Sequence, residues 1–210
     1  MPRRTEAPAT PGRRLVLASA SPARLELLRR AGLHPEVVVS GLDETGFEDP
    51  DPAALTGRLA RAKAEAVAHM PLADGALVLG CDSLLGLDGV AYGKPADPAD
   101  AVQRWRRLRG RRALLHTGHH LIDTEGSQAV EGVESTVVRF GEPTDAEIDA
   151  YVASGEPLAV AGGFTIDGRG GAFVAGIEGN PSNVIGLSIP ALRAMLATLG
   201  ISYTDLWTSA

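Results

Sequence analysis

A short strand, a polar turn and a helix follow one another near the start of the chain, and this succession constrains the fold more than any other stretch. Residues 15–17 (Leu-Val-Leu) form an apolar run typical of a buried strand. Ser21 is a favoured helix N-cap, and Pro22 suits the first helical position, where its missing N–H costs nothing. Gly32 predicts the end of this helix. The apolar residues expected on its buried face are Leu25, Leu28 and Ala31.

The turn before this helix has the chemistry of an anion site. A helix N-terminus presents free N–H groups and the positive end of the helix dipole. The hydroxyls of Ser19 and Ser21 and the guanidinium of Arg24 lie in the same turn, and all of them suit phosphate. The alternative is an ordinary capped amphipathic helix with a solvated arginine. This stretch by itself leaves both interpretations open.

Composition narrows the class of protein. With 210 residues, 44% of them hydrophobic and 22% charged, the chain fits a globular domain. A formal net charge of −6 argues against nucleic-acid binding, which normally needs a basic surface. No apolar stretch approaches the roughly 20 residues of a membrane span. The single cysteine, Cys81, excludes an internal disulfide and a multi-cysteine zinc site, and it favours a cytoplasmic location.

The pattern of strands and helices predicts one α/β domain over residues 15–202. Residues 1–14 hold four arginines and three prolines without the apolar core of a signal peptide, and we expect a disordered tail there. We expect Trp207, in a C-terminal tail of residues 203–210, to pack on its own domain rather than on a partner. Further strands are expected at residues 35–39, 76–80, 84–87, 113–124 and 130–140, with hairpin turns at 88–89 and 125–127. Further helices are expected over 52–69, after Asp97, after Thr144 and over 190–199. The buried stripe expected for helix 52–69 is Leu55, Leu59, Ala62 and Ala66.

Carboxylates occur at two places next to predicted strands. Asp82 lies between two apolar strand segments, where burial of a carboxylate costs free energy unless it is paired, hydrogen-bonded or bound to a metal. The alternative is a half-buried aspartate satisfied by backbone amides. Asp43 and Glu44 follow the second strand in a polar turn. Carboxylate oxygens are the ligands that Mg²⁺ prefers, so these residues are candidate metal ligands.

Two lysines occupy ordered positions in the predicted fold. Lys63 lies one helix position from an apolar stripe and could reach a neighbouring cleft, although a solvated lysine is the simpler interpretation. Lys94 is held between a glycine and a proline in the loop after a hairpin. Glycine-rich residues 161–180 indicate a cleft wall or a loop over a ligand. Cations that neutralise phosphate and carboxylates that bind Mg²⁺ together suit a nucleoside triphosphate, hydrolysed by a metal-bound or aspartate-activated water.

The common signatures of other enzyme classes are missing from the sequence. It has no P-loop, no Gly-x-Ser-x-Gly elbow and no His-Glu-x-x-His pair, and the glycines at 168–170 do not continue into a dinucleotide fingerprint. His116, His119 and His120 fall within one predicted strand, where neighbouring residues point to opposite faces. We therefore expect half-buried or solvated histidines there rather than metal ligands.

Five segments, taken in order, resemble the Maf family and together extend over nearly all of residues 15–200. They are residues 17–28 (Leu-Ala-Ser-Ala-Ser-Pro-Ala-Arg-Leu-Glu-Leu-Leu), 59–64, 80–83, 93–95 and 161–164. The resemblance implies a nucleoside triphosphate pyrophosphatase that cleaves between the α and β phosphates and uses Mg²⁺ or Mn²⁺. It also implies an elongated mixed β-sheet flanked by helices in two lobes with a cleft between them, as in inosine triphosphate pyrophosphatases. The family is linked to the clearing of non-standard nucleotides and to arrest of septum formation, and a homodimer would be compatible with it.

The resemblance also assigns roles to the candidate residues. It makes Asp82 the catalytic aspartate and places Glu44 and Asp82 near the metal. The expected phosphate-binding residues are Ser19, Ser21, Arg24, Lys63 and Lys94. The alternative function is a nucleotide-sensing regulatory module that affects cell division without relying on catalysis.

One departure from the family bears on the choice of base. Members that act on thymidine and uridine triphosphates carry glutamine where this chain has Asp167. An ionised aspartate only accepts hydrogen bonds, whereas glutamine both donates and accepts. Asp167 is therefore expected to favour bases that present donors, such as guanine or cytosine. Residues 179–187 are closer to members that act on methylated guanine triphosphate.

Overall fold

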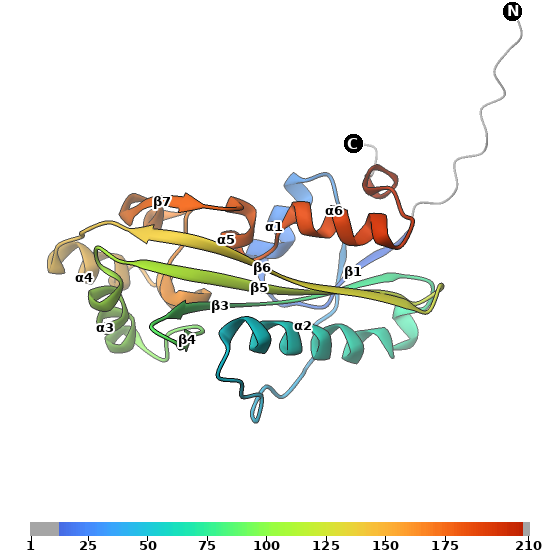
Figure 1. Cartoon of the computed structure of the whole chain (residues 1–210), viewed down its shortest axis with the longest axis horizontal. Coiled ribbons are helices and arrows are strands. Elements are labelled where there is room, and N and C mark those ends of the chain that lie inside the picture. Colours follow the sequence, from blue (N-terminus) through green and yellow to red (C-terminus); the bar gives the residue numbers. More distant parts are fainter. Residues whose placement is uncertain (1–12, 208–210) are drawn as a thin grey trace, which may run out of the picture.

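The computed structural model describes residues 13–207, and in this part of the chain a mixed sheet of seven strands forms the centre (Figure 1). Its strands are β1 (Leu15–Leu17), β2 (Glu36–Val37), β3 (Leu77–Leu87), β4 (Val90–Tyr92), β5 (Arg112–Asp123), β6 (Gln128–Phe140) and β7 (Val174–Glu178). Strand order is β2-β1-β3-β5-β6-β7, with β4 paired to β3. Strand β1 runs parallel to β2 and β3, and the other pairs are antiparallel. This is the mixed sheet that the resemblance implied.

Strand β3 has an open edge in its middle. Its pairing with β1 ends at Leu79, and its pairing with β4 begins at Leu85. Among the described residues, no strand covers β3 between these two points on that side. Asp82 and Ser83 lie in this gap.

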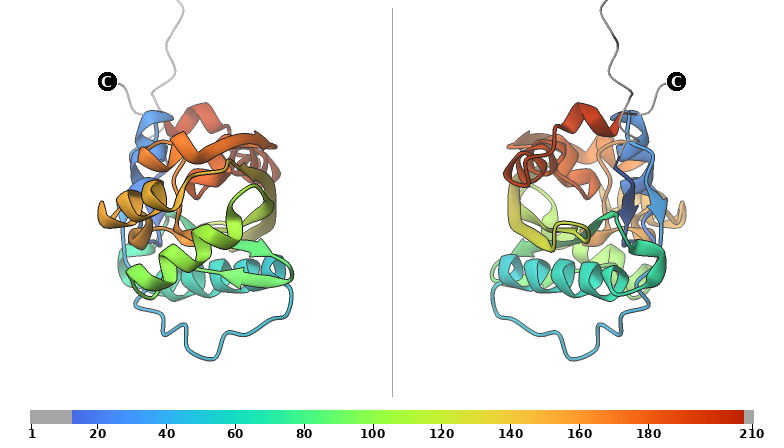
Figure 2. Two further views of the ribbon diagram at one scale, coloured as in Figure 1. Left: turned by 90° about the vertical axis from the view of Figure 1, so that its left-hand side faces the viewer. Right: turned by 90° about the vertical axis from the view of Figure 1, so that its right-hand side faces the viewer.

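Helices cover both faces of the sheet and one of its ends (Figure 1). They are α1 (Pro22–Arg30), α2 (Pro52–Ala68), α3 (Pro98–Leu108), α4 (Asp145–Ala153), α5 (Pro181–Ile185) and α6 (Ile189–Thr198). Helix α2 lies along one face, α1, α5 and α6 lie on the other, and α3 and α4 close the far end. The loop between β2 and α2 projects beyond α2 (Figure 2). Short 3₁₀ turns occur at Pro71–Ala73, Glu156–Ala159, Ala161–Gly163, Arg169–Phe173 and Tyr203–Leu206.

Three hydrophobic core clusters pack the described residues, and two of them lie at opposite ends of the long strands. One joins β1 and the start of β3 to α1 and α6, and Leu17, Leu79 and Leu192 are fully buried in it. The other joins the end of β3 to β5, β6, α3 and α4 around the fully buried Trp105, whose indole N–H donates to the Gly163 carbonyl at 2.8 Å. The central strands span both cores, so the chain has two packed ends with a space between them.

Local signals in the sequence predicted the element ends well. The Ser21 hydroxyl accepts from the Arg24 N–H at the start of α1, and Gly32 follows this helix with φ of +82°. Thr144 and Glu147 form the predicted capping box of α4. The two strands expected at 76–80 and 84–87 are one continuous strand, β3. Helix α5 was not expected, since only five residues form it.

The buried stripe predicted for α2 was wrong except for Leu59. The buried residues are Thr56, Leu59, Ala60, Ala64 and Val67. The rotation has a steric cause, because glycines of the sheet admit this helix at very short distance. A Cβ on Gly80 would lie 2.2 Å from the Ala60 carbonyl oxygen, and one on Gly118 would lie 2.2 Å from the carbonyl oxygen of Thr56. Small residues therefore make the closest contacts with the sheet, although Leu59 and Val67 are buried as well.

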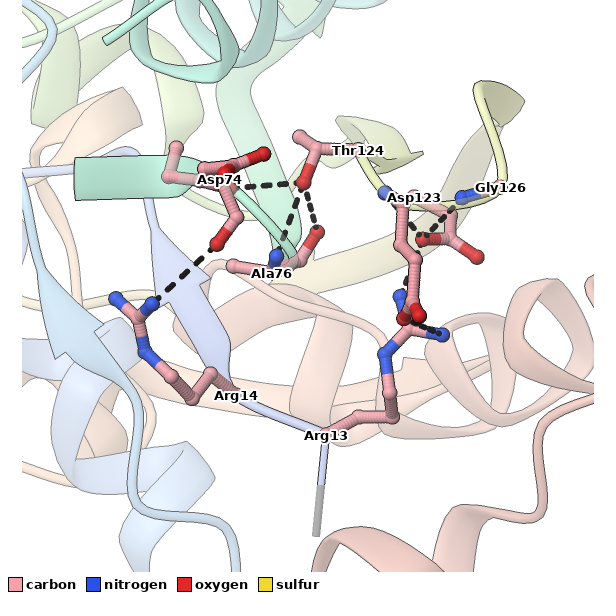
Figure 3. Close-up of polar contacts among 9 residues, drawn as sticks. Arg13, Arg14, Asp74, Ala76, Asp123, Thr124 and Gly126 are labelled. Carbon is pink, nitrogen blue, oxygen red and sulfur yellow. Dashed lines mark hydrogen bonds and ion pairs between the residues drawn. The ribbon is translucent and has the colours of Figure 1, made fainter. Parts of the chain in front are cut away.

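The two ends of the described chain are attached to the domain, and Figure 3 shows the contacts of Arg13 and Arg14 at the N-terminal end. Arg13 pairs with Asp123 at the β5–β6 hairpin, and Arg14 contacts Glu36 and the Asp74 carbonyl oxygen. Both arginines therefore have partners in the domain; residues 1–12 of the expected tail lie outside the described residues. At the other end Trp207 forms a bridge with Leu33, so the tail packs on its own domain as far as residue 207. Between residues 13 and 207, no helix has the length and apolar character needed to cross a membrane.

Candidate active site

A cavity of about 560 Å³ opens at the uncovered edge of β3, between the two cores. Eight of the residues predicted from the sequence line it: Ser19, Ser21, Arg24, Glu44, Lys63, Asp82, Lys94 and Asp167. Asp43, the other candidate metal ligand, does not line it, and its carboxylate accepts from the Thr45 N–H instead. They come from the β1–α1 turn, the β2–α2 loop, α2, β3, the loop after β4 and the glycine-rich segment. The volume is in the range of small-molecule sites. The fold thus gathers into one cavity residues that are up to 148 positions apart in the chain.

Arg24 is buried at the first turn of α1 and holds three elements together. Its guanidinium donates from Nη1 to the Ser19 hydroxyl at 2.9 Å and from Nη2 to the Ser83 hydroxyl at 2.9 Å. Its Nε donates to the Gly186 carbonyl oxygen at 2.7 Å. Each terminal nitrogen carries two N–H groups, so one on each remains for a ligand in the cavity. Arg24 therefore joins the turn, β3 and α5 while facing the site.

Lys63 reaches from α2 to both carboxylates of the site. Its ammonium lies 2.5 Å from Asp82 Oδ1 and 2.8 Å from Glu44 Oε1. Lys63 and Asp82 are both largely buried, whereas Glu44 is half exposed on the β2–α2 loop. The close approach of α2 to Gly80, two residues before Asp82, brings this lysine within reach. Asp82 lines the cavity, and within residues 13–207 its side-chain contact is made through Oδ1.

The loop that carries Lys94 is fixed by its backbone. Arg104 of α3 donates to the Gly93 carbonyl oxygen at 2.7 Å, and the Gly162 N–H donates to the same oxygen at 3.0 Å. Lys94 itself is exposed, and its ammonium pairs with no carboxylate of the described chain. A cation on a rigid loop at the rim of the cavity is available for an anionic ligand.

The part of the cavity that the glycine-rich segment lines is more apolar. Phe164, Thr165, Ile166 and Asp167 line it together with Ala159. The phosphate-type residues come from the β1–α1 turn, α2 and the loop after β4. The cavity therefore has a strongly charged part and a part that suits a flat, partly apolar group.

Two carboxylates of the site fit a divalent cation. Glu44 and Asp82 face the cavity within reach of one ammonium, and Mg²⁺ is commonly bound through one or two carboxylates plus substrate phosphates. No group of three or more His, Cys, Asp or Glu side chains in the described chain is placed to hold a metal ion. The donor set therefore fits a cation that shares its coordination with a phosphate ligand.

Sequence reasoning missed the residues that support Arg24. The Ser83 hydroxyl lies 3.0 Å from the Thr117 hydroxyl, which donates to the Asn183 carbonyl oxygen at 3.3 Å. The only signal in the sequence for the role of Ser83 is that it follows Asp82 directly. Cys81, on the other side of Asp82, is fully buried. Burial raises the pKa of the Cys81 thiol to about 12, so this thiol is no nucleophile at neutral pH.

The three strand histidines lie on both faces of β5, His119 on one and His116 and His120 on the other, but the expectation that they are half-buried or solvated was wrong, because all three are buried. His119 is buried and its Nε2 accepts from the Ser188 N–H at 2.9 Å, at the start of α6. Burial, with the nearby Arg24 charge, lowers the pKa of His119 to about 4, so its imidazole is neutral. His116 lies against the Ser135 hydroxyl at 2.8 Å on the α2 face. These are structural side chains outside the cavity.

Comparison with known proteins decides the family. A family model described as Maf-like protein matches residues 14–199. The chain belongs to the Maf family. Maf relatives match it over almost their full length: one from Streptomyces coelicolor is 60% identical over 200 residues (95% of this chain and 97% of the relative). One from Streptomyces avermitilis is 59% identical over 198 residues (94% and 96%), and one from Cyanothece sp. is 54% identical over 192 residues (91% and 98%). Each of these Maf relatives is named nucleoside triphosphate pyrophosphatase.

Proposed function

We propose that this Maf protein is a nucleoside triphosphate pyrophosphatase that hydrolyses the bond between the α and β phosphates. The observation that carries the proposal is the single cavity that combines Asp82 with Arg24, Lys63, Lys94 and the N-terminus of α1. The names of its Maf relatives support the same activity. The products would be a nucleoside monophosphate and pyrophosphate.

Asp82 is the residue we assign to water activation. Lys63 holds Oδ1 of this cavity-lining carboxylate, and we assign the other oxygen, Oδ2, to the water. In the proposed step the oxygen of a water molecule attacks the α-phosphorus while its proton passes to Asp82 Oδ2. The bond from the α-phosphorus to the bridging oxygen breaks, and pyrophosphate leaves with that oxygen.

The cations of the site stabilise the charge that develops on the phosphates. Arg24 offers a fixed pair of N–H groups, and the free N–H groups of α1 add the positive end of a helix dipole. Lys94 on its rigid loop supplies a further charge. Preorganised charges of this kind are often the largest contribution to catalysis.

The proposal includes a divalent cation, Mg²⁺ or Mn²⁺, held by Glu44 and Asp82 together with phosphate oxygens. When bound, such a cation would neutralise charge on the triphosphate. Lys63, which contacts both carboxylates, keeps them oriented toward the same point. The substrate class and the lone buried thiol of Cys81 support a cytoplasmic location.

Replacement of the aspartate tests the activity. Asp82→Asn should lower kcat by about 10²–10⁴-fold, the usual contribution of a general base, with nucleotide affinity changed far less. The matched control is Asp88→Asn in the exposed β3–β4 turn, where asparagine tolerates the φ of +53°. The assay separates monophosphate from diphosphate products with Mg²⁺ present. Wild-type turnover retained by Asp82→Asn would remove Asp82 from this role, and intact binding without turnover in the wild type would favour the regulatory module.

We further propose that Asp167 disfavours thymine and uracil and favours bases that present hydrogen-bond donors. It lines the apolar end of the cavity beside Ile166. A hydrogen bond to a charged group contributes about 1.5–3 kcal/mol, so Asp167→Gln should raise kcat/KM for UTP relative to GTP by about 10–100-fold. Asp74→Gln, an exposed carboxylate outside the cavity lining, is the control. An unchanged ranking of nucleotides in Asp167→Gln would contradict the assignment.

A further inference from the structure

A half-buried carboxylate behind the cavity wall accepts four hydrogen bonds. Glu156 begins the 3₁₀ turn after α4 and does not line the cavity. Its Oε1 accepts from the Thr165 hydroxyl at 2.5 Å, the Gly170 N–H at 3.0 Å and the Tyr151 hydroxyl at 3.1 Å. Its Oε2 accepts from the Arg169 N–H at 3.1 Å. Four donors from two segments of the chain converge on this one side chain.

The carboxylate stays charged in this surrounding. Burial alone would raise the pKa of Glu156, but the hydrogen bonds from Thr165, Gly170, Arg169 and Tyr151 outweigh it and lower the pKa. Burial raises the pKa of the Tyr151 hydroxyl, so this group remains a donor. Hydrogen bonds to a charged acceptor are stronger than bonds between neutral groups. Three of the four bonds come from residues 165–170, so they tie this short segment to Glu156.

The backbone around Glu156 leaves no room for side chains. A Cβ on Gly168 would lie 2.8 Å from Glu156 Oε1, and one on Gly170 would lie 2.4 Å from the Tyr151 hydroxyl oxygen. The segment from Thr165 to Gly170 is thus wrapped tightly around the carboxylate. The glycine content of this segment had indicated a cleft wall or a loop over a ligand, but not the carboxylate that it surrounds.

The opposite side of this segment forms the apolar end of the cavity. Thr165, Ile166 and Asp167 line it, and Ala159, three residues after Glu156, lines it as well. We propose that Glu156 is a positioning residue for base selection: by fixing the Thr165–Gly170 loop it sets where Asp167 meets the nucleobase. This inference rests on the proposed function, but the loop geometry that it predicts can be measured without turnover.

Glu156→Gln is the sharpest variant, because it keeps the size of the side chain and removes its charge. Its amide NH₂ group would face N–H and O–H donors, so the loop should lose at least one of its anchors. We expect the preference between GTP and UTP to fall by about tenfold, since a base contact worth about 1.5 kcal/mol is lost when Asp167 moves. The value of kcat for the preferred nucleotide should change less than threefold, because Asp82 and the cations come from other elements.

Three measurements belong to the experiment. The first is the ratio of kcat/KM for GTP and UTP in wild type, Glu156→Gln, Tyr151→Phe and Glu147→Gln. The second is the ratio of Kd values for the same nucleotides by calorimetry without added divalent metal. The third is hydrogen exchange of the Arg169 and Gly170 amides. Tyr151→Phe removes one of the four donors and keeps the carboxylate, so its ratio should lie between those of wild type and Glu156→Gln. Glu147→Gln removes a carboxylate from the exposed capping box of α4 and should leave the ratio unchanged.

Different outcomes refute different statements. Lack of turnover in the wild type would refute the proposed function, and the Kd ratios and amide exchange would still test the role of Glu156. Equal loss of kcat for both nucleotides, with unchanged ratios and unchanged amide protection, would overturn the inference and leave the activity intact. If Glu156→Gln does not fold, an unchanged ratio in Tyr151→Phe overturns it instead.

Discussion

Gly80 is the point at which one methyl group should damage both stability and activity. A Cβ at this position would lie 2.2 Å from the carbonyl oxygen of Ala60 and 2.8 Å from the Cβ of Ala64. Normal contacts between carbon and a carbonyl oxygen begin at about 3.3 Å. Because the obstacle is helix backbone, Gly80→Ala must push α2 away from the sheet by roughly 1 Å.

The cost of this displacement can be estimated. Overpacking of a tight core costs about 1–3 kcal/mol, and a domain of this size loses about 2–4 °C in Tm for each kcal/mol. We therefore expect Tm to fall by about 3–10 °C. Lys63 lies between Ala60 and Ala64 on α2, with its ammonium 2.5 Å from Asp82. A shift of about 1 Å there should lower kcat by about 10–100-fold.

The assay is thermal unfolding together with turnover, with Gly57→Ala as the matched control. Gly57 lies in the same helix, but its Cβ would meet only Val133 Cγ2 at 3.4 Å, an ordinary contact. Alanine is the better helix former, so Gly57→Ala should raise stability by about 0.5–1 kcal/mol with unchanged kcat. A Tm for Gly80→Ala equal to or above that of the wild type would refute the account of how α2 is seated.

Two further predictions concern groups outside the cavity. The folded pKa of His119 is about 4, below the ordinary value of about 6.5, so the unfolded chain binds the proton more readily and stability should fall as pH drops from about 6.5 to 4. The loss approaches about 3 kcal/mol. Urea unfolding should show that the free energy of unfolding depends less steeply on pH in His119→Gln, whose amide oxygen can still accept from Ser188. An identical pH dependence in the two proteins would contradict the prediction. Arg13→Met should lower Tm by about 2–4 °C, because Asp123 loses a partner in a largely buried pair. Arg30→Met removes an exposed ion pair and should change Tm by less than about 1 °C; equal effects of the two variants would show that the Arg13 contact adds nothing.

The ends of helices and the hairpin turns could be predicted from the sequence because their causes are local. The Ser21 cap of α1, the capping box at Thr144 and the turn at Asp88 each depend on hydrogen bonds or backbone angles within a few residues. The types of the site residues were equally informative. A carboxylate within an apolar strand and a lysine held between glycine and proline are costly or unusual unless they serve a ligand, and both Asp82 and Lys94 line the cavity.

What failed depends on contacts between distant parts of the chain. The face that α2 buries is set by the absence of side chains at Gly80 and Gly118, and apolar periodicity within the helix carries no information about that. The partners of Arg24 are likewise non-local, since Ser83 lies 59 positions away and Gly186 lies 162 positions away.

The amino-acid sequence by itself determined the starts of the longer helices, the hairpin turns, the family, and which side chains carry charge at unusual places. Only the tertiary structure decided that Lys63 joins Asp82 to Glu44, and that Glu156 organises a loop whose other side lines the cavity. The physical reason is that capping and turn energies act within a few residues along the chain. The placement of a buried charge depends instead on close packing between segments that the sequence does not bring together.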